Sequence, residues 1–526
     1  MKILASTSFI GTTGYANHSK SFFTELDKLT PVKIRNFTIG ESWKGHNKTP
    51  HDGEPYITDQ MKKMLTLQTL WSGEGDNKKR EDFPIYDYEP GKMFDINIVL
   101  NETDHFYFYD SYGNYKIAYN VWESTLQPEN YFNRLRDYYH ELWVPSEWQK
   151  DVTIKQGFPE DKIFVIPEGV DVDTFKPLEN PQYPDKFRFM IFGRWDYRKY
   201  IKECIEAWLK AFPRNQYKDV ELLLSVENPF SVDGMKSTTE RLQRYGLQDP
   251  RIKIVKFPPR QEYINYLQNG HVFLSCARSE GWNLPLIEAM ACGTPSIYSA
   301  GSGQMEFAEG KGLPVKILGE KLANSNDYGR YTMSDLPGYY PEPDFRDLSL
   351  VMRDAFENYT DHKKRALEES KIIHKNFNWD HIANIGNNTL QDFIDNYTPI
   401  ASQSNDIIIT YTDGPKVEIN GDNVEDYFIE FINNETNEVI HSTTMTNNMW
   451  TSCSRKYYIP WIIKINGVIV DKLDLTDEHV MISLESDSIG DTIAWVPYAV
   501  EFAKKHNCKI SLSTFYNSWF QNLPVY

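Results

Sequence analysis

The sequence is poor in cysteine, in long apolar runs and in positive charge, and each shortage excludes a class of protein. Its five cysteines include no Cys-x-x-Cys pair and no metal-ligand spacing, so we expect reduced core thiols rather than disulfides or a zinc site. They are Cys204, Cys276, Cys292, Cys453 and Cys508. No apolar run is long enough to cross a bilayer, and the N-terminus does not resemble a signal peptide. We therefore expect a cytoplasmic protein without a transmembrane segment, for which peripheral membrane contact stays open.

The charge balance argues against a nucleic-acid partner. The chain has 56 basic and 74 acidic residues, a formal net charge of -18. A phosphate backbone is bound by a clustered basic face, which such a composition does not favour. A few placed cations are still enough to bind an anionic small molecule.

A chain of 526 residues exceeds one compact core, so we expect several domains. Residues 1–178 are interpreted as an α/β domain, because a strand at 2–6 runs into a glycine loop at 11–14 and then into a helical pattern. The segment 40–91 is polar and irregular, and its role stays open. Further strands of this domain are predicted at Val32–Phe37, Ile96–Leu100, Lys116–Asn120, Leu142–Val144 and Ile163–Ile166.

A proline-rich spacer precedes a second α/β domain, which we place at residues 179–378. Strands and helices alternate from Phe187 to Tyr298, a pattern that predicts a parallel sheet with ligands at the carboxyl ends of its strands. Two such Rossmann-like domains in tandem would form a cleft. The helix within residues 379–400 is expected to pack back on the first domain.

The pattern changes near residue 401. Short strands separated by Asp-Gly and Asn-Gly turns predict a small β-sandwich-like module over 401–477. Residues 478–526 are interpreted as the start of another α/β unit with barely two strands. We expect that this unit is incomplete and that the chain is a fragment of a longer protein.

The strongest chemical pattern lies where a predicted strand of the second domain meets a helix that begins near Leu284. A helix N-terminus at a strand end offers free N–H groups and partial positive charge to a diphosphate. Gly281 would let the backbone approach closely. Glu280 and Glu288 flank this point and can accept hydrogen bonds from sugar and ribose hydroxyls. On periodicity alone, an amphipathic helix with two solvated glutamates explains the pattern equally well.

The run EGWNLPLIEAMACGTP at residues 280–295 resembles the Glu-x7-Glu motif EGFGLPxxEAMAxGxP of retaining, glycogen-synthase-like glycosyltransferases with the GT-B fold, family four in the usual classification. The departures are Trp282 for Phe and Asn283 for Gly. The resemblance covers roughly residues 1–397 and implies that Gly281 to Leu284 and Glu288 bind the donor, with Glu280 contacting the transferred sugar.

Other elements extend the resemblance. Residues 192–199, FGRWDYRK, are similar to the family's Gly-Arg-x-x-x-x-Lys element, which implies that Arg194 and Lys199 hold the donor diphosphate with Arg198 beside them. The downstream glycine loop matches at Gly301 and Gly303. The interdomain run VIPEGVD at 165–171 resembles VIPNGVD, with Glu168 replacing Asn.

The acceptor half carries weaker signals. Gly14 stands where the family's glycine loop meets the donor phosphates, and Glu123 ends a strand, where it either contacts sugar or acceptor or caps a helix. His18 is interpreted as structural. Farther on, residues 485–495 resemble the start of autotransporter O-heptosyltransferases, which implies that Asp491 is the site of an incomplete second module.

The resemblance implies sugar transfer from a nucleotide-sugar to a glycan, lipid-linked glycan or protein acceptor, with retention and with neither a metal nor a cofactor. A sugar-nucleotide epimerase on the same fold, or a non-catalytic carbohydrate-binding or scaffold protein, remains an alternative. The sequence does not identify the base, the sugar, the acceptor or the oligomeric state.

Overall fold

A computed structural model shows how the chain is organised. It describes residues 2–10, 13–38, 58–72, 79–84, 94–101, 113, 115–228, 234–323, 338–396, 405–412, 414–421, 426–453, 459–484 and 486–517. The chain forms two compact units, one of Met1–Tyr88 with Phe94–Tyr397 and one of Glu89–Met93 with Thr398–Tyr526. Every helix in the described residues is too short or too polar to cross a lipid bilayer.

The first Rossmann-like domain is built on an eight-stranded sheet of order β4-β3-β2-β1-β5-β6-β7-β8. All neighbours are parallel except β3 and β4. Its strands are β1 (Ile3–Thr7), β2 (Val32–Thr38), β3 (Leu65–Ser72), β4 (Lys79–Pro84), β5 (Ile96–Leu100), β6 (Tyr115–Tyr119), β7 (Glu141–Val144) and β8 (Ile163–Val165). Its helices are α1 (Gly14–Leu29), α3 (Asp59–Met64), α4 (Glu129–Tyr138), α5 (Glu147–Gln156) and the 3-10 turn η3 (Glu160–Lys162). The central strands β1 and β5 are buried throughout, because helices cover both faces of a parallel sheet.

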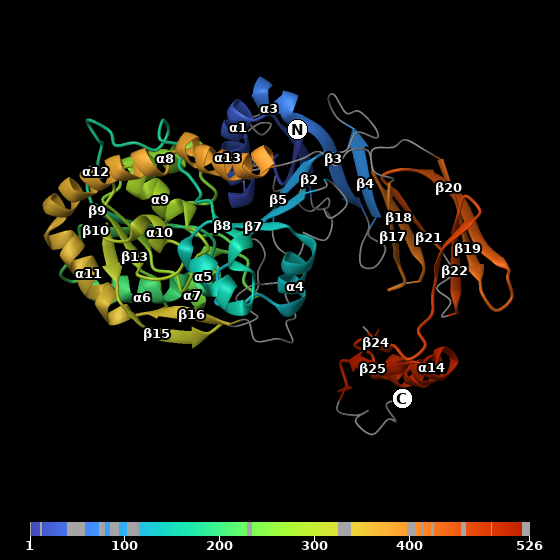
Figure 1. Cartoon of the computed structure of the whole chain (residues 1–526). Coiled ribbons are helices and arrows are strands. Elements are labelled where there is room, and N and C mark those ends of the chain that lie inside the picture. Colours follow the sequence, from blue (N-terminus) through green and yellow to red (C-terminus); the bar gives the residue numbers. More distant parts are fainter. Residues whose placement is uncertain are drawn as a thin grey trace. The chain divides into compact units, whose positions relative to one another are not determined.

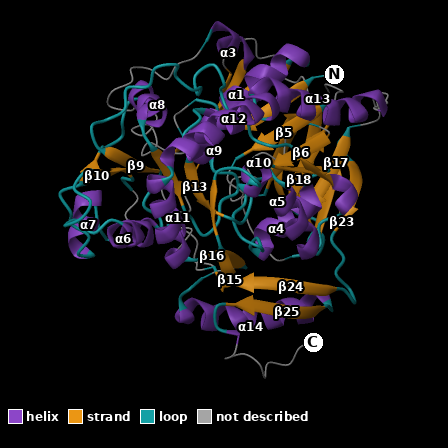
Figure 2. Ribbon diagram, turned by 90° about the vertical axis from the view of Figure 1, so that its left-hand side faces the viewer, coloured by secondary structure: helices purple, strands orange, loops and turns teal. Residues whose placement is uncertain are grey.

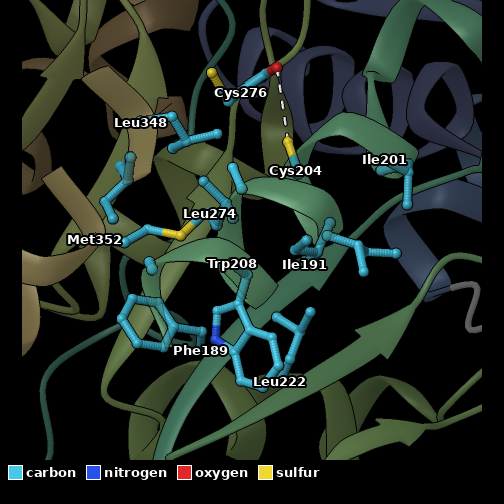
Figure 3. Close-up of a cluster of buried hydrophobic side chains, with 14 of the residues drawn as sticks. Phe189, Ile191, Ile201, Cys204, Trp208, Leu222, Leu274, Cys276, Leu348 and Met352 are labelled. Carbon is cyan, nitrogen blue, oxygen red and sulfur yellow. Dashed lines mark hydrogen bonds between the residues drawn. The ribbon is translucent and has the colours of Figure 1, made fainter. Parts of the chain in front are cut away.

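The second Rossmann-like domain has a six-stranded, fully parallel sheet of order β11-β10-β9-β12-β13-β14. Its strands are β9 (Phe187–Phe192), β10 (Val220–Ser225), β11 (Ile252–Ile254), β12 (Val272–Ser275), β13 (Ser296–Ser299) and β14 (Leu313–Val315). Its helices are η4 (Tyr197–Lys199), α6 (Ile201–Ala211), α7 (Thr238–Arg244), α8 (Arg260–Asn269), α9 (Leu284–Ala291), α10 (Met305–Ala308) and α11 (Phe345–Glu357). On one face of the sheet, Trp208 of α6 and Met352 of α11 pack with Phe189 and Leu222 in a fully buried cluster (Figure 3).

The chain crosses between these two domains at two adjacent places. Residue Val170 leads out of the first domain, and its N–H donates to the carbonyl of Phe377 (2.7 Å) where the chain returns. Helix α12 (Tyr359–Asn376) leads to this return and α13 (Trp379–Asn396) follows it. In Figure 1, α13 lies beside α1, and Trp379 and Ile382 share the buried core of the first domain with Phe22.

Several elements in this unit were not predicted, among them an edge of the first sheet and a hairpin in the second domain. The described parts of segment 40–91 form α3, β3 and β4, which extend the first sheet at its edge. Strands β15 (Ile317–Leu322) and β16 (Tyr339–Pro343) pair as an antiparallel hairpin in the second domain. The other strands expected in the two Rossmann-like domains are present with small shifts in their ends, so the predicted fold class is confirmed.

The second unit contains two antiparallel sheets and a small parallel one. The order is β17-β18-β21 in one sheet and β20-β19-β22-β23 in the other, and their apolar residues share one core that includes Trp461 and Phe431. The strands are β17 (Asp406–Thr410), β18 (Lys416–Asn420), β19 (Asp426–Asn433), β20 (Val439–Thr446), β21 (Met449–Ser452), β22 (Trp461–Ile465) and β23 (Val468–Lys472). Strands β24 (His479–Leu484) and β25 (Lys509–Thr514) pair in parallel, and α14 (Ile489–His506) lies against them (Figure 2).

Candidate functional site

The loop between β12 and α9 ends in a residue with left-handed backbone. Asn283 has φ 90° and stands directly before Leu284, the first residue of α9. Its side-chain Nδ2 donates to Gln304 Oε1 (2.7 Å) and to Ser275 Oγ (2.9 Å). Asparagine is, after glycine, among the residues that adopt this conformation most readily. The replacement of the motif's glycine by Asn283 is therefore compatible with the turn geometry, and the two hydrogen bonds hold it.

Two glycines let backbones meet at this loop. A Cβ on Gly303 would lie 1.9 Å from the carbonyl oxygen of Gly281, so only glycine fits there. A Cβ on Gly281 would lie 2.4 Å from Val121 Cγ1 of the first domain. The Gly303 N–H donates to the Glu280 carbonyl (3.0 Å), and the Glu280 N–H donates to Ser302 Oγ (3.0 Å). The loop carrying Glu280 is thus held between the downstream glycine loop and the first domain.

The carboxylate of Glu280 is buried, with 4% of the residue exposed, and lies between two cations. Arg198 Nη1 donates to one of its oxygens (2.7 Å) and Lys199 Nζ to the other (2.5 Å). Burial by itself would raise the pKa of Glu280, but the charges of Arg198 and Lys199 outweigh it and hold the pKa below its usual value. Glu280 is therefore an ionised hydrogen-bond acceptor fixed in orientation.

Residues of the first domain reach the same place. Glu123 Oε1 lies 3.1 Å from Arg198 Nη2. Gly14, the first residue of α1, faces the start of α9, because a Cβ on it would lie 3.8 Å from Leu284 Cδ1. The structure therefore brings Glu123 and Gly14 to the loop between β12 and α9 that carries Glu280, called the donor loop below because the sequence resemblance assigns it to the donor.

Glu288 lies one turn into α9 and has partners of its own. Its Oε2 accepts a hydrogen bond from the Tyr263 hydroxyl (2.5 Å), and its Oε1 lies 3.4 Å from Arg260 Nη2. Burial raises the pKa of Glu288, although Arg260 and Tyr263 oppose the rise. Arg260 and Tyr263 were missed from the sequence. The available signal was their position: they lie at the start of α8, after the carboxyl end of β11, where a parallel sheet binds its ligands.

The other residues predicted for the site, Arg194, Trp282 and Gly301, have contacts of their own. Arg194 donates from Nε to Asp196 Oδ2 (2.7 Å), and its side chain is 51% exposed. Trp282 is buried and packs against Phe307. Gly301 packs against Pro341 of β16, since a Cβ there would lie 2.9 Å from that ring. Gly11 and Thr12 lie outside the described residues.

Asp491 belongs to the second unit. It is the third residue of α14, and its Oδ2 accepts a hydrogen bond from Ser486 Oγ (2.8 Å). Its backbone N–H lies 3.4 Å from Ser488 Oγ, the N-cap of the helix. These hydrogen bonds are those of an ordinary helix N-terminus, and they do not indicate a catalytic role for Asp491.

The described residues include no group of three or more His, Cys, Asp or Glu side chains arranged to hold a metal ion. All five cysteines are free and buried. His18 is buried as well, with its ring between Tyr119 and Trp379.

Two Rossmann-like domains in tandem are the architecture of the GT-B class of glycosyltransferase fold. In this chain a fixed carboxylate, two cations and a helix N-terminus meet between them. Residues 173–313 match the model of the family described as "Glycosyl transferases group 1". This range contains Arg194 to Lys199, Glu280 to Glu288, and the glycine loop.

Among curated proteins, the chain is similar to a component of the phosphatidylinositol N-acetylglucosaminyltransferase of Arabidopsis thaliana, with 24% identity over 172 residues, 33% of this chain and 37% of that protein. A shorter match, 33% identical over 70 residues, is to the autotransporter heptosyltransferase BAHTCr of Citrobacter rodentium and covers 12% of this chain and 17% of that protein. The chain thus spans well under half the length of these relatives. Among solved structures, Anabaena HepE in complex with UDP and glucose aligns with a TM-score of 0.52 at 13% identity, covering 74% of this chain and all of that one. At this identity the likeness concerns the fold alone.

Proposed function

We propose that this chain is a glycosyltransferase that moves a sugar from a nucleotide-sugar donor to a glycan, lipid-linked glycan or protein acceptor, with retention of configuration and without a metal, in the cytoplasm. The observation that carries the proposal is the fixed Glu280 carboxylate beside Lys199 and the start of α9, at the strand ends of the domain that matches the glycosyl transferases group 1 model.

The geometry suits a donor whose diphosphate lies at the N-terminus of α9. The free N–H groups of the first turn and the Lys199 ammonium would stabilise the negative charge that develops as the bond from sugar to diphosphate breaks. Glu280, held ionised, can accept hydrogen bonds from hydroxyls of the transferred sugar. Glu288, with Tyr263 beside it, would accept from the ribose.

The acceptor would approach from the first domain. Glu123 is an acidic side chain of that domain that lies next to the donor loop, through its contact with Arg198. We propose retention on the family resemblance alone. The short match to an autotransporter heptosyltransferase is the reason to include protein acceptors in any panel.

Binding tests the proposal first. The full chain would be melted alone and with UDP-glucose, UDP-N-acetylglucosamine, GDP-mannose and an ADP-heptose. A ligand that binds only the folded protein, present at 100 times its Kd, stabilises it by about 2.7 kcal/mol. If no sugar nucleotide changes the melting curve, the donor site is misassigned.

Turnover then separates the candidate activities. Wild-type protein with the best donor should transfer sugar to an acceptor in a glycan, lipid-linked glycan and protein panel. Lys199→Ala and Glu288→Ala should each reduce transfer about 100-fold or more, whereas Lys210→Ala, an exposed lysine on α6, should not. Near-normal turnover in Lys199→Ala or Glu288→Ala contradicts the assignment. An epimerised nucleotide formed without acceptor would indicate the epimerase instead, and saturable binding without transfer would indicate a binding protein.

A further inference from the structure

Arg198 of the second domain contacts a carboxylate in each Rossmann-like domain: Glu280 of its own domain and Glu123 of the first. We propose that Arg198 is a positioning residue: it orients Glu280 toward the transferred sugar and couples that orientation to Glu123 of the first domain, while Lys199 alone of this pair holds the donor diphosphate. The inference rests on the proposed function and deepens it, because it separates the roles of two adjacent cations.

The contacts of Arg198 leave little room for a phosphate. Its Nη1 donates to the Ser279 carbonyl (2.5 Å) and to Glu280 Oε2 (2.7 Å), and its Nη2 lies 3.1 Å from Glu123 Oε1. The residue is 8% exposed. A guanidinium is a planar fork that fits several oxygen acceptors at fixed angles, and here two carboxylates and a carbonyl take three of its five N–H donors, including both on Nη1.

Lys199 differs from Arg198 both in its contacts and in its exposure. Its ammonium donates to Glu280 Oε1 at 2.5 Å, and its side chain is 18% exposed against 10% for Arg198. An ammonium carries three N–H donors, so Lys199 can keep its contact with Glu280 and still donate to a phosphate oxygen. Lys199 is thus more accessible to an incoming anion, whereas Arg198 is held by carboxylates of both domains.

The 3-10 turn η4 explains why both cations reach Glu280. Arg198 and Lys199 are the last two residues of this turn, and Tyr200 after them has a left-handed backbone with φ 51°. The Arg198 carbonyl also accepts from the Arg278 N–H (2.9 Å), which ties the turn to the loop that precedes Glu280. Arg198 is therefore fixed by backbone as well as by its side chain.

Glu123 is in turn held by the second domain. Two residues along, the Thr125 N–H donates to the Tyr339 carbonyl (3.2 Å) and Thr125 Oγ1 accepts from the Tyr339 N–H (2.8 Å). Gly281 packs against Val121 on the other side. Segment 121–125 is therefore held against the second domain by the β15–β16 hairpin and by the donor loop. Separation of the domains would break the Arg198–Glu123 contact and free the group that orients Glu280.

The test compares a nucleotide with its sugar nucleotide by calorimetric titration of the full chain, using UDP and UDP-glucose, with GDP and GDP-mannose as a second pair. In Arg198→Gln we expect UDP affinity to change by less than about threefold, since Arg198 does not contact the diphosphate. The extra affinity of UDP-glucose over UDP should be lost, and kcat should fall about 100-fold, because a misplaced contact group costs that much in rate. Lys199→Ala should instead lose UDP affinity about 10-fold or more.

A double-mutant cycle tests the coupling to the first domain. Glu123→Gln should lower kcat in the wild-type background but have little further effect in Arg198→Lys, because a lysine does not hold both carboxylates at once. This cycle stands even if Arg198→Gln does not fold. A loss of UDP affinity above about 10-fold in folded Arg198→Gln overturns the separation of roles, and additive effects of the two substitutions overturn the coupling. If wild-type protein binds neither nucleotide pair nor any other sugar nucleotide, the proposed function fails instead.

Discussion

Glu168, which replaces the asparagine of the related motif, should make the stability of the first unit depend on pH. It follows β8 at the first of the two crossings between domains and is 4% exposed. The imidazole of His18 lies beside it, with His18 Nδ1 3.4 Å from Glu168 Oε2. Burial raises the pKa of Glu168 to about 8 and lowers that of His18 to about 3, so both side chains are neutral at pH 7.

Whether the unfolding free energy rises or falls with pH depends on which state, folded or unfolded, binds more protons. Between pH 4.5, the ordinary pKa of the carboxyl, and about 8, the folded state holds a proton on Glu168 that the unfolded state has lost. Stability therefore falls with rising pH by about 1.4 kcal/mol per unit. For His18 the unfolded state holds the extra proton between about 3 and 6.5, so its contribution rises with pH by the same slope. The two slopes cancel from pH 4.5 to 6.5, and the pair's contribution falls by about 2 kcal/mol from pH 6.5 to 8.

Glu168→Gln isolates the carboxyl. The difference in unfolding free energy between wild type and Glu168→Gln should move against the wild type by about 3 kcal/mol from pH 5.5 to 7.5, a shift of several degrees in relative Tm. Thermal scans at one scan rate measure it, and subtraction removes the other titrating groups. The exposed Glu160→Gln should show no such trend. A difference that stays constant from pH 5.5 to 7.5 would mean that Glu168 ionises normally in the folded protein and that the reasoning is wrong.

Two substitutions test the loop that holds Glu280. Gly303→Ala should reduce transfer about 100-fold, because its Cβ cannot fit 1.9 Å from the Gly281 carbonyl, whereas Gly490→Ala in α14, with no contact closer than 3.7 Å, should leave transfer unchanged. Equal activity in both would show that the loop does not need this close approach. Asn283→Val should destabilise the protein by about 1–2 kcal/mol from the left-handed backbone alone, while Asn283→Gly should be milder, and a melting comparison in which valine is the better tolerated would contradict that backbone geometry.

The close approach of Gly281 to Val121 and the contact of Thr125 with Tyr339 have a common consequence for function. Both contacts join the second domain to the segment of the first domain that carries Glu123, one through the donor loop and the other through β16. In the proposed reaction, sugar and acceptor meet between these segments. A small change in either would therefore alter the relative position of donor and acceptor, to which transfer rates are highly sensitive.

Much of the site was readable from sequence because its signals are local. A buried strand and a helix start are encoded within a few residues, which is why α9 begins at Leu284 as predicted. That Gly303 lies against Gly281 was not predicted, because the two glycines are distant in sequence. The alternation of strands and helices likewise predicted two parallel sheets. The stretch 40–91 has no clear periodicity, and its described strands became visible only as edge strands of a sheet.

Other features depend on contacts between distant residues, which no local pattern encodes. Spacing alone did not show that Arg198 rather than Arg194 joins Lys199 at Glu280, because the direction of each side chain is set by the turn η4 and the loop before Glu280. The Arg198–Glu123 pair joins the two domains. The burial that raises the pKa of Glu168 comes from the packing of α1 and α13 around the crossing. The sequence by itself determined the central strands and helices of the two sheets and the donor motif. The tertiary structure decided the edge strands and which charged groups face one another, since both depend on how distant segments pack.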